Sequence, residues 1–350
     1  MSAWLLRLMD TISNSSWFEF SLPPNQHVDF LGVMYAAPSK SEDPETAALV
    51  MEAFIEDFRS RIWITYRKNF PSLIDKDGTE VGITSDAGWG CSVRATQMLV
   101  AQSLRFRWFG RDSCLEKEKY CKILRHFVDH PSAALSIHKI VSLGHSRFGK
   151  SPSEWFGPTT SARAVELLIN QKKSELGIAA VLFDGGEIYT SEVISLFEND
   201  HEAVLVMVSH RLGLDSFNLP RYKGTIQSLF SCPFFQGLSS GEAMVSAYYF
   251  FAACDDYLFY LDPHTVQEER DIENCAFPPQ PKPLRMRWSR LNPSLTMGFV
   301  IKSPKEWDQL ADYLSKIDPE LFDINLKRRE IRHSFSDINS ESESDLVIID

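Results

Sequence analysis

The 350-residue chain contains little cysteine and no apolar stretch long enough to cross a bilayer. A membrane-spanning helix needs about 20 consecutive apolar residues, whereas the longest apolar run here is 247–254. The N-terminal segment carries Arg7 and Asp10 within its apolar part, which is atypical of a secretory signal peptide. The six cysteines form no Cys-x-x-Cys pair, which argues against a zinc knuckle and favours reduced thiols in a cytoplasmic protein.

The chain also lacks an excess of basic residues, since 36 Lys and Arg against 47 Asp and Glu give a formal net charge of −11. Nucleic-acid binding needs a basic footprint, so we expect no nucleic-acid partner. His126 and His130 have the spacing of a helical metal-binding pair, but no Glu follows His126 and Pro131 ends any helix there. We interpret this segment as a solvated helix end and predict no metal site.

Apolar residues make up 44% of the chain and charged residues 24%, which is typical of a folded protein with its own core. Helical spacing of apolar residues predicts helices over 46–66, 91–104, 161–176 and 304–317, and two more between 114 and 147 on either side of Pro131. Apolar and β-branched runs predict strands over 178–183, 203–209, 245–254, 257–262 and 297–302.

Early helices followed by a strand-rich second half predict an α+β fold. We expect three regions along the chain. They are a partly mobile N-terminal arm (1–40), a main domain (41–318) and a mobile acidic, Ser-rich tail (319–350).

Cys91 has the surroundings that a nucleophilic cysteine needs. It follows Gly88 and Gly90 at the start of a predicted helix. Glycine allows a tight turn and close backbone approach. A helix N-terminus stabilises a thiolate and offers free N–H groups to a developing oxyanion. Free cysteine is also a common core residue, so this context alone leaves a structural role open.

The segment Asp262-Pro263-His264 ends a predicted strand. Alternate residues of an extended chain point to the same side, and Pro263 favours an extended conformation for Asp262. Asp262 could then orient His264 as a general base, although Asp-Pro is also common in ordinary turns.

Cys91, Asp262 and His264 together form the residue set of a thiol hydrolase. Other cysteine chemistries fit less well. Gln97 stands where a cysteine-dependent phosphatase needs Arg, and no second cysteine lies close enough in sequence for a redox pair.

Several motifs occur in the order found in one known family: 66–71, 84–102, 136–138, 155–158, 211–214, 260–267, 292–295 and 298–299. On these motifs the chain resembles the autophagins, the autophagy cysteine proteases that process a ubiquitin-like modifier. The resemblance implies a papain-like cysteine peptidase fold with a small inserted helical and strand subdomain. It implies that Cys91 is the nucleophile, His264 the general base and acid, and Asp262 its orienter.

The resemblance also implies roles for residues around these three. Tyr66 matches a side chain of the oxyanion hole, and Trp155 matches a tryptophan that narrows the entrance beside Cys91. Arg211 and Leu214 match positions of the substrate groove.

One segment departs from the family. The family has a Gly-Gly-basic-Pro loop over the active site, but the aligned stretch 239–246 keeps only Gly241 and lacks the basic residue and the proline. By this match Gly241 is a further candidate substrate-binding residue. Ser92 replaces an apolar residue after the cysteine.

The implied function is a cysteine endopeptidase that needs no cofactor and cleaves after the C-terminal Gly of a ubiquitin-like autophagy modifier. It would mature the modifier precursor and release the modifier from phosphatidylethanolamine, touching membranes transiently through the lipidated substrate. Two alternatives remain: a catalytically silent modifier-binding protein, and a deubiquitinase-like or transglutaminase-like enzyme on the same residues.

A short motif in the tail suggests a further contact with the modifier. Phe335 and Ile338 have the aromatic-x-x-aliphatic spacing by which this modifier binds partners, and an ordinary acidic tail is the alternative.

Overall fold

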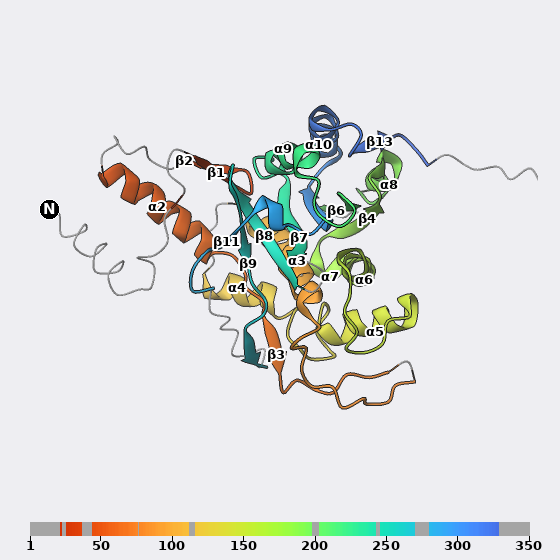
Figure 1. The fold of residues 1–350 in the computed structure, drawn as a ribbon. Helices are drawn as coiled ribbons and strands as arrows, with labels where there is room; N and C mark the ends of the chain where they lie inside the picture. Colours follow the sequence, from red (N-terminus) through yellow and green to blue (C-terminus); the bar gives the residue numbers. More distant parts are fainter. Residues whose placement is uncertain are drawn as a thin grey trace, which may run out of the picture.

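A computed structural model of the protein describes these residues: 22, 26–36, 44–75, 77–111, 116–197, 203–242, 246–269 and 280–328. A central sheet lies between layers of helix, with α3 against its middle and α9 and α10 at one end (Figure 1). This architecture confirms the α+β class expected from the order of helical and strand patterns.

The central sheet has nine strands and is antiparallel except for the pair β4–β6. Its main path is β11-β9-β8-β7-β12-β6-β4, and the hairpin β1–β2 joins it through β8. The strands are β1 (His27–Phe30), β2 (Val33–Ala36), β4 (Ala179–Asp184), β6 (Val204–Arg211), β7 (Phe235–Glu242), β8 (Ser246–Ala253), β9 (Tyr257–Leu261), β11 (Leu284–Arg287) and β12 (Ser294–Ile301).

Two short parallel pairs lie beside the main sheet. One joins β3 (Tyr66–Lys68) to β10 (Val266–Glu268), and the other joins β5 (Glu187–Tyr189) to β13 (Asp323–Asn325). The first pair matters for function because it brings the chain around Tyr66 next to the chain that follows β9.

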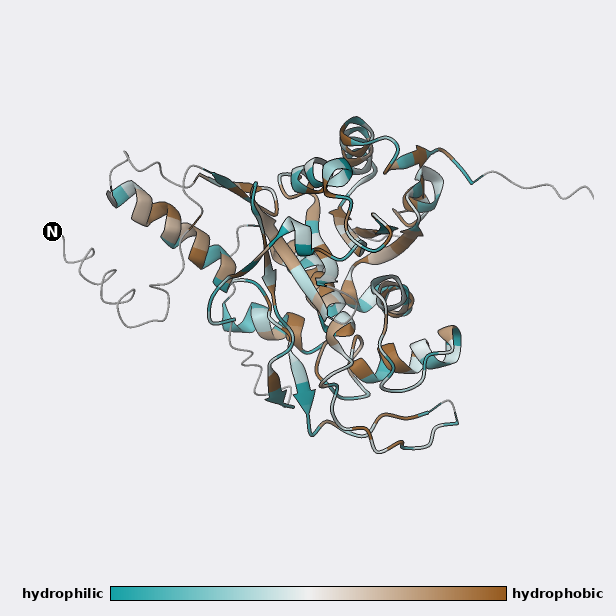
Figure 2. Cartoon of the chain, viewed as in Figure 1, coloured by the Kyte–Doolittle hydropathy of each residue, from teal (hydrophilic) through white to brown (hydrophobic). Residues whose placement is uncertain are grey.

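The helices cover this framework. They are α2 (Pro44–Arg59), α3 (Cys91–Phe109), α4 (Lys117–Leu124), α5 (Ile137–Phe148), α6 (Pro158–Gln171), α7 (Lys173–Leu176), α8 (Thr190–Ser195), α9 (Leu219–Leu229) and α10 (Pro304–Ile317), with a 3-10 turn at Trp288–Arg290. Apolar residues concentrate in the central strands, whereas hydrophilic residues cover much of α9 and α10 (Figure 2).

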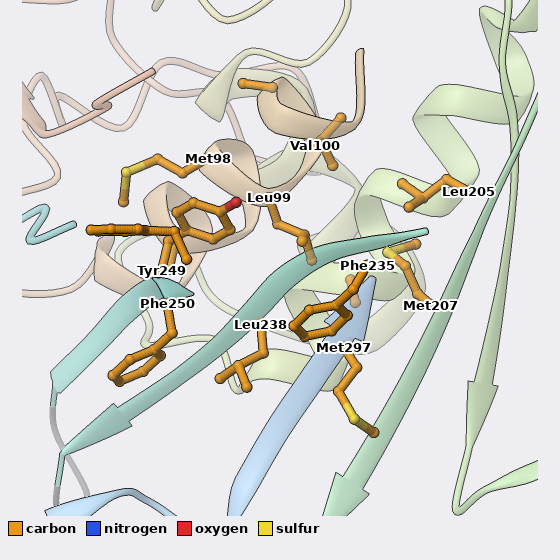
Figure 3. Close-up of a cluster of buried hydrophobic side chains, with 14 of the residues drawn as sticks. Met98, Leu99, Val100, Leu205, Met207, Phe235, Leu238, Tyr249, Phe250 and Met297 are labelled. Carbon is orange, nitrogen blue, oxygen red and sulfur yellow. The ribbon is translucent and has the colours of Figure 1, made fainter. Parts of the chain in front are cut away.

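Helix α3 is the central helix of the core. Its residues from Cys91 to Arg105 are all buried. Its side chains, including Met98 and Leu99, gather with those of the neighbouring strands in one apolar cluster (Figure 3). Gly298 of β12 allows this close packing, because a Cβ there would lie 2.9 Å from Leu99. The first residue of α3 is therefore held by a rigid, well-packed element.

Three boundaries differ from the sequence expectation. The first helix ends at Arg59, because Ile62 and Ile64 are buried in an extended segment that leads into β3. The helix expected over 161–176 already begins at Pro158, as α6. The expected tail begins too early at 319, since residues 323–325 form β13 and Phe322 is buried.

Within the described ranges, none of the helices combines the length and the apolar character that crossing a bilayer requires. Among the described residues, the cysteines at positions 91, 121, 232 and 254 form no disulfide bond. Cys114, Cys275, residues 1–21 of the N-terminal arm, and the tail from 329 onwards with Phe335 and Ile338 lie outside the described residues.

Candidate active site

Cys91 is the first residue of α3 and is buried. The first N–H groups of an α-helix have no acceptor within the helix, and the helix dipole adds partial positive charge at this end. The predicted position of Cys91 at a helix start is thus confirmed by the fold.

A buried carboxylate shapes the turn before Cys91. Asp86 accepts the backbone N–H of Arg67 at 2.6 Å, and its carboxylate is bound by Arg94 Nε at 2.7 Å and Nη2 at 3.0 Å. A Cβ at Gly90 would lie 2.3 Å from Asp86 Oδ2, so only glycine fits there. Gly88 has a φ of +88°, which also favours glycine. The glycines before Cys91 therefore serve this buried turn.

His264 and Asp262 form the pair expected from their spacing. His264 Nδ1 lies 2.5 Å from Asp262 Oδ1, which also accepts the backbone N–H of His264 at 2.9 Å. The same imidazole donates a hydrogen bond to the sulfur of Cys91. One imidazole thus connects a carboxylate to a thiol.

Asp262 is fixed through its backbone as well. Its N–H donates to Gln280 Oε1 at 2.7 Å, and its carbonyl accepts from Trp63 Nε1 at 2.6 Å. The next carbonyl, that of Pro263, accepts the N–H of Tyr66 at 2.8 Å. These bonds hold the end of β9 against β3 and fix the backbone from which the His264 side chain extends.

Tyr66 and Trp155 meet the same thiol. Both side chains donate hydrogen bonds to the Cys91 sulfur, and the Tyr66 oxygen accepts the backbone N–H of Gly88. The Tyr66 ring lies edge-on to the His264 ring, with centroids 5.4 Å apart. The five residues Cys91, His264, Asp262, Tyr66 and Trp155 therefore converge as the resemblance implies.

These contacts shift the proton equilibrium of the pair. Burial alone would raise the pKa of Cys91, but hydrogen bonds from His264, Tyr66 and Trp155 outweigh it and hold that pKa below its ordinary value. Burial alone would lower the pKa of His264, but Asp262 and Cys91 raise it to about 9. At neutral pH the geometry favours a thiolate beside an imidazolium, the reactive form of a cysteine nucleophile.

Arg211 and Leu214 lie at the C-terminal end of β6 and in the turn after it. Arg211 donates to the carbonyl of Leu214 and, at 3.0 Å, to Ser294 Oγ. Leu214 is 83% exposed. The two residues contact each other and form an exposed surface, and their role in binding substrate stays a prediction.

Gly241 belongs to strand β7, which corrects the expectation of a loop over 239–246. Residues 239–242 pair with β8, so only 243–245, outside the described residues, lie between the two strands. The carbonyl of Gly241 accepts the N–H of Asn292 at 2.8 Å, and a Cβ at Gly241 would lie 1.7 Å from the Ser246 carbonyl oxygen. The glycine is explained by close strand packing, and a substrate contact stays a prediction.

The interpretation of His126 as part of a solvated helix end is wrong. Helix α4 ends at Leu124, and the His126 ring is buried with the Trp108 ring 5.6 Å away. His130 is exposed and its Nδ1 shares a hydrogen bond with Ser132 Oγ at 2.7 Å. Within the described part of the chain, no group of three or more His, Cys, Asp and Glu side chains could hold a metal ion.

Sequence reasoning missed three residues next to the candidate triad. Trp63 and Gln280 bind the backbone of Asp262, and the ring of Tyr248 lies against His264 with centroids 5.3 Å apart. No sequence signal marks Gln280. Tyr248 lies in a run of aromatic residues that indicates a buried strand and hides any more specific role.

Comparisons with known proteins agree with this geometry. A family model described as the peptidase C54 catalytic domain matches residues 51–313. A protein of Pichia angusta named probable cysteine protease ATG4 is 30% identical over an alignment of 342 positions, which covers 85% of this chain and 67% of that protein. Proteins of the same name from Botryotinia fuckeliana (31% identical, 83% and 73%) and Aspergillus niger (30% identical, 90% and 82%) are also similar. The matched region contains all five converging residues.

Proposed function

Because the chain belongs to the peptidase C54 family of papain-like cysteine peptidases, the resemblance to autophagins is confirmed, and we propose that it cleaves a ubiquitin-like autophagy modifier after its C-terminal Gly. The proposed reaction matures the modifier precursor and also releases the modifier from phosphatidylethanolamine. The observation that carries the proposal is the imidazole of His264 between Asp262 and Cys91, with bonds to both.

Acylation begins with the Cys91 thiolate. Its sulfur attacks the carbonyl carbon of the Gly, and the carbonyl oxygen becomes an oxyanion. In this proposal the Tyr66 hydroxyl, which contacts the Cys91 sulfur, and the N–H of Cys91 at the helix start donate to that oxygen. His264 gives its proton to the leaving amine as the C–N bond breaks, which leaves a thioester on Cys91.

Deacylation uses the same groups. His264 takes a proton from water, the hydroxide attacks the thioester carbonyl, and the C–S bond breaks. The products are the Gly carboxylic acid, which loses its proton to water and leaves as the carboxylate, and the regenerated thiolate beside the imidazolium. Asp262 keeps the imidazole oriented through both steps, because it holds Nδ1 at 2.5 Å.

Selectivity for Gly is consistent with the crowding around the thiol. Tyr66 and Trp155 both contact the sulfur of Cys91, so a substrate residue with a side chain has little room beside it. Arg211 and the exposed Leu214 supply a candidate surface for the globular body of the modifier. The proposed place of action is the cytoplasm, with membrane contact through the lipidated substrate.

The test is to incubate the full chain with a modifier precursor that carries a C-terminal extension and to read the product masses. We expect one cut immediately after Gly in the wild type and in Cys121→Ala, and none in Cys91→Ala with precursor binding retained. Cys121 is a matched control because it is a half-buried cysteine on another helix, α4.

Other outcomes would replace the proposal. Binding without any cut would indicate a silent modifier-binding protein. Cleavage of a ubiquitin fusion in preference to the modifier would indicate a deubiquitinase-like enzyme. An unchanged cut by Cys91→Ala would refute the nucleophile.

The tail motif is tested separately. If Phe335 and Ile338 bind the modifier, deletion of residues 330–350 should weaken its binding while cleavage at saturating substrate stays the same. Unchanged affinity would reduce the segment to an ordinary acidic tail.

A further inference from the structure

A second tyrosine lies against the candidate general base. Tyr248 is a buried residue of β8, and its ring centroid lies 5.3 Å from that of His264 with an interplanar angle of 64°. Tyr66 approaches the same imidazole at 5.4 Å and 86°. Both rings therefore meet the imidazole closer to edge-on than to stacked, an arrangement that aromatic rings prefer.

Tyr248 is itself held from two sides. Its ring contacts that of Tyr260 with centroids 4.5 Å apart, and its hydroxyl is hydrogen-bonded by the side chain of Ser246. Both partners belong to regular strands, β9 and β8. The Tyr248 ring is thus held in a fixed position against the His264 imidazole.

The Tyr248 ring lies against a part of the site that solvent reaches. The side chains of His264 and Asp262 are 31% and 30% exposed, so water has access to their hydrogen bond. Burial raises the pKa of Tyr248, and the negative charges of Asp262 and Cys91 raise it further, so the phenol stays neutral at the site.

Hydrogen bonds to Asp262 and Cys91 restrain the imidazole at two points but leave it free to tilt about the line between them. We propose that Tyr248 is a positioning residue that blocks this tilt and keeps the His264 imidazole aligned between Asp262 and Cys91. The inference rests on the proposed role of His264. Small displacements of a reacting group cost up to about 100-fold in rate.

The experiment compares Tyr248→Leu with Tyr248→Phe. For Tyr248→Leu we expect kcat to fall about 10- to 100-fold with KM within about threefold of wild type. Tyr248→Phe keeps the ring and should stay within about threefold of wild type in kcat, because the proposal assigns the effect to the ring and not to the hydroxyl.

A second readout follows the thiolate directly. The rate at which iodoacetamide alkylates Cys91, measured from pH 4 to 10 on the full chain, reports how much thiolate exists below the ordinary cysteine range. We expect the low-pH alkylation to be lost in His264→Asn, strongly reduced in Tyr248→Leu, and retained in Tyr248→Phe.

Tyr257→Leu is the matched control. It makes the same chemical change on the neighbouring strand, where the ring of Tyr257 lies 4.7 Å from the Arg285 guanidinium. It should leave kcat and the alkylation profile as in wild type. If Tyr248→Leu is unfolded at the assay temperature, Tyr248→Met replaces it, since it keeps the bulk but not the flat ring.

The outcomes separate the two levels of the proposal. A folded Tyr248→Leu with unchanged kcat and alkylation would overturn the positioning role, and so would a rise in KM alone, which would place Tyr248 in substrate binding. A loss of more than tenfold in Tyr248→Phe would shift the role to the hydroxyl and also overturn the proposal. If wild type and His264→Asn alkylate alike, the thiolate–imidazolium pair itself is wrong.

Discussion

Tyr66→Phe isolates one hydrogen-bond donor in the proposed mechanism. The Tyr66 hydroxyl donates to the sulfur of Cys91 and accepts the N–H of Gly88, while the ring lies edge-on to His264. Phenylalanine keeps the ring and its contact with the imidazole and removes only the hydroxyl. The variant therefore tests the donor without removing the aromatic wall.

The expected magnitude follows from the chemistry of that donor. Loss of one oxyanion-hole donor typically lowers kcat by about 100- to 1,000-fold, or about 2.7–4 kcal/mol of transition-state stabilisation. The same hydroxyl lowers the pKa of Cys91. In the variant the pH profile of Cys91 alkylation by iodoacetamide should therefore move to higher pH. KM should change little, because the bond to the oxyanion forms only in the transition state.

The assay is steady-state cleavage of the modifier precursor, with Tyr189→Phe as the control. The Tyr189 hydroxyl also makes a side-chain hydrogen bond, at 2.5 Å to Glu187, but this bond is exposed and lies on β5. We expect this control to match wild type. A loss of less than about fivefold in Tyr66→Phe, or a change confined to KM, would remove Tyr66 from the oxyanion hole.

Two further predictions concern the framework of the site. Gly90→Ala should lower the free energy of unfolding by about 1–3 kcal/mol and reduce kcat, because its Cβ would displace the buried Asp86 carboxylate. The control in the same urea titration is Gly224→Ala on α9, where nothing lies within 4 Å of the added Cβ. Equal stability of the two variants would contradict this reasoning. Burial lowers the pKa of His126 to about 4, so the unfolded chain takes up a proton near pH 6.5 that the folded chain resists until about pH 4. The free energy of unfolding should thus decrease as the pH is lowered from about 6.5 to about 4, by at most about 3 kcal/mol from this group. The urea midpoint should decrease less steeply over this range in His126→Leu. Parallel pH profiles of the two proteins would refute the assignment.

Local patterns predict the elements whose stability is local. Helix α10 has the predicted bounds, 304–317, because Pro304 begins it and the Ser303 hydroxyl accepts the N–H of Glu306 as a cap. The strand β7 was missed because Ser239 and Ser240 are small and polar, yet both are buried there. Neighbouring strands on both sides determine that strand, and no single-segment pattern records them.

The candidate site likewise combines features that follow local sequence patterns with contacts that only the fold creates. The glycines before Cys91 and the alternation of Asp262 and His264 are local features, so the sequence predicts them. Trp63 and Gln280 bind Asp262 from 199 and 18 positions away along the chain, and no pattern at such separations is visible in one sequence. The contact of Tyr248 with His264 is likewise made by the fold and follows no local sequence pattern.

The sequence by itself determined the α+β class, the family resemblance and the residues that carry the proposed chemistry, because these depend on residue types and short spacings. The tertiary structure decided that Cys91 and His264 meet and that the pKa of His264 rises to about 9 while that of Cys91 falls. Those shifts depend on distance and burial, since the strength of a charge interaction is set by the separation of the groups and by the water excluded around them.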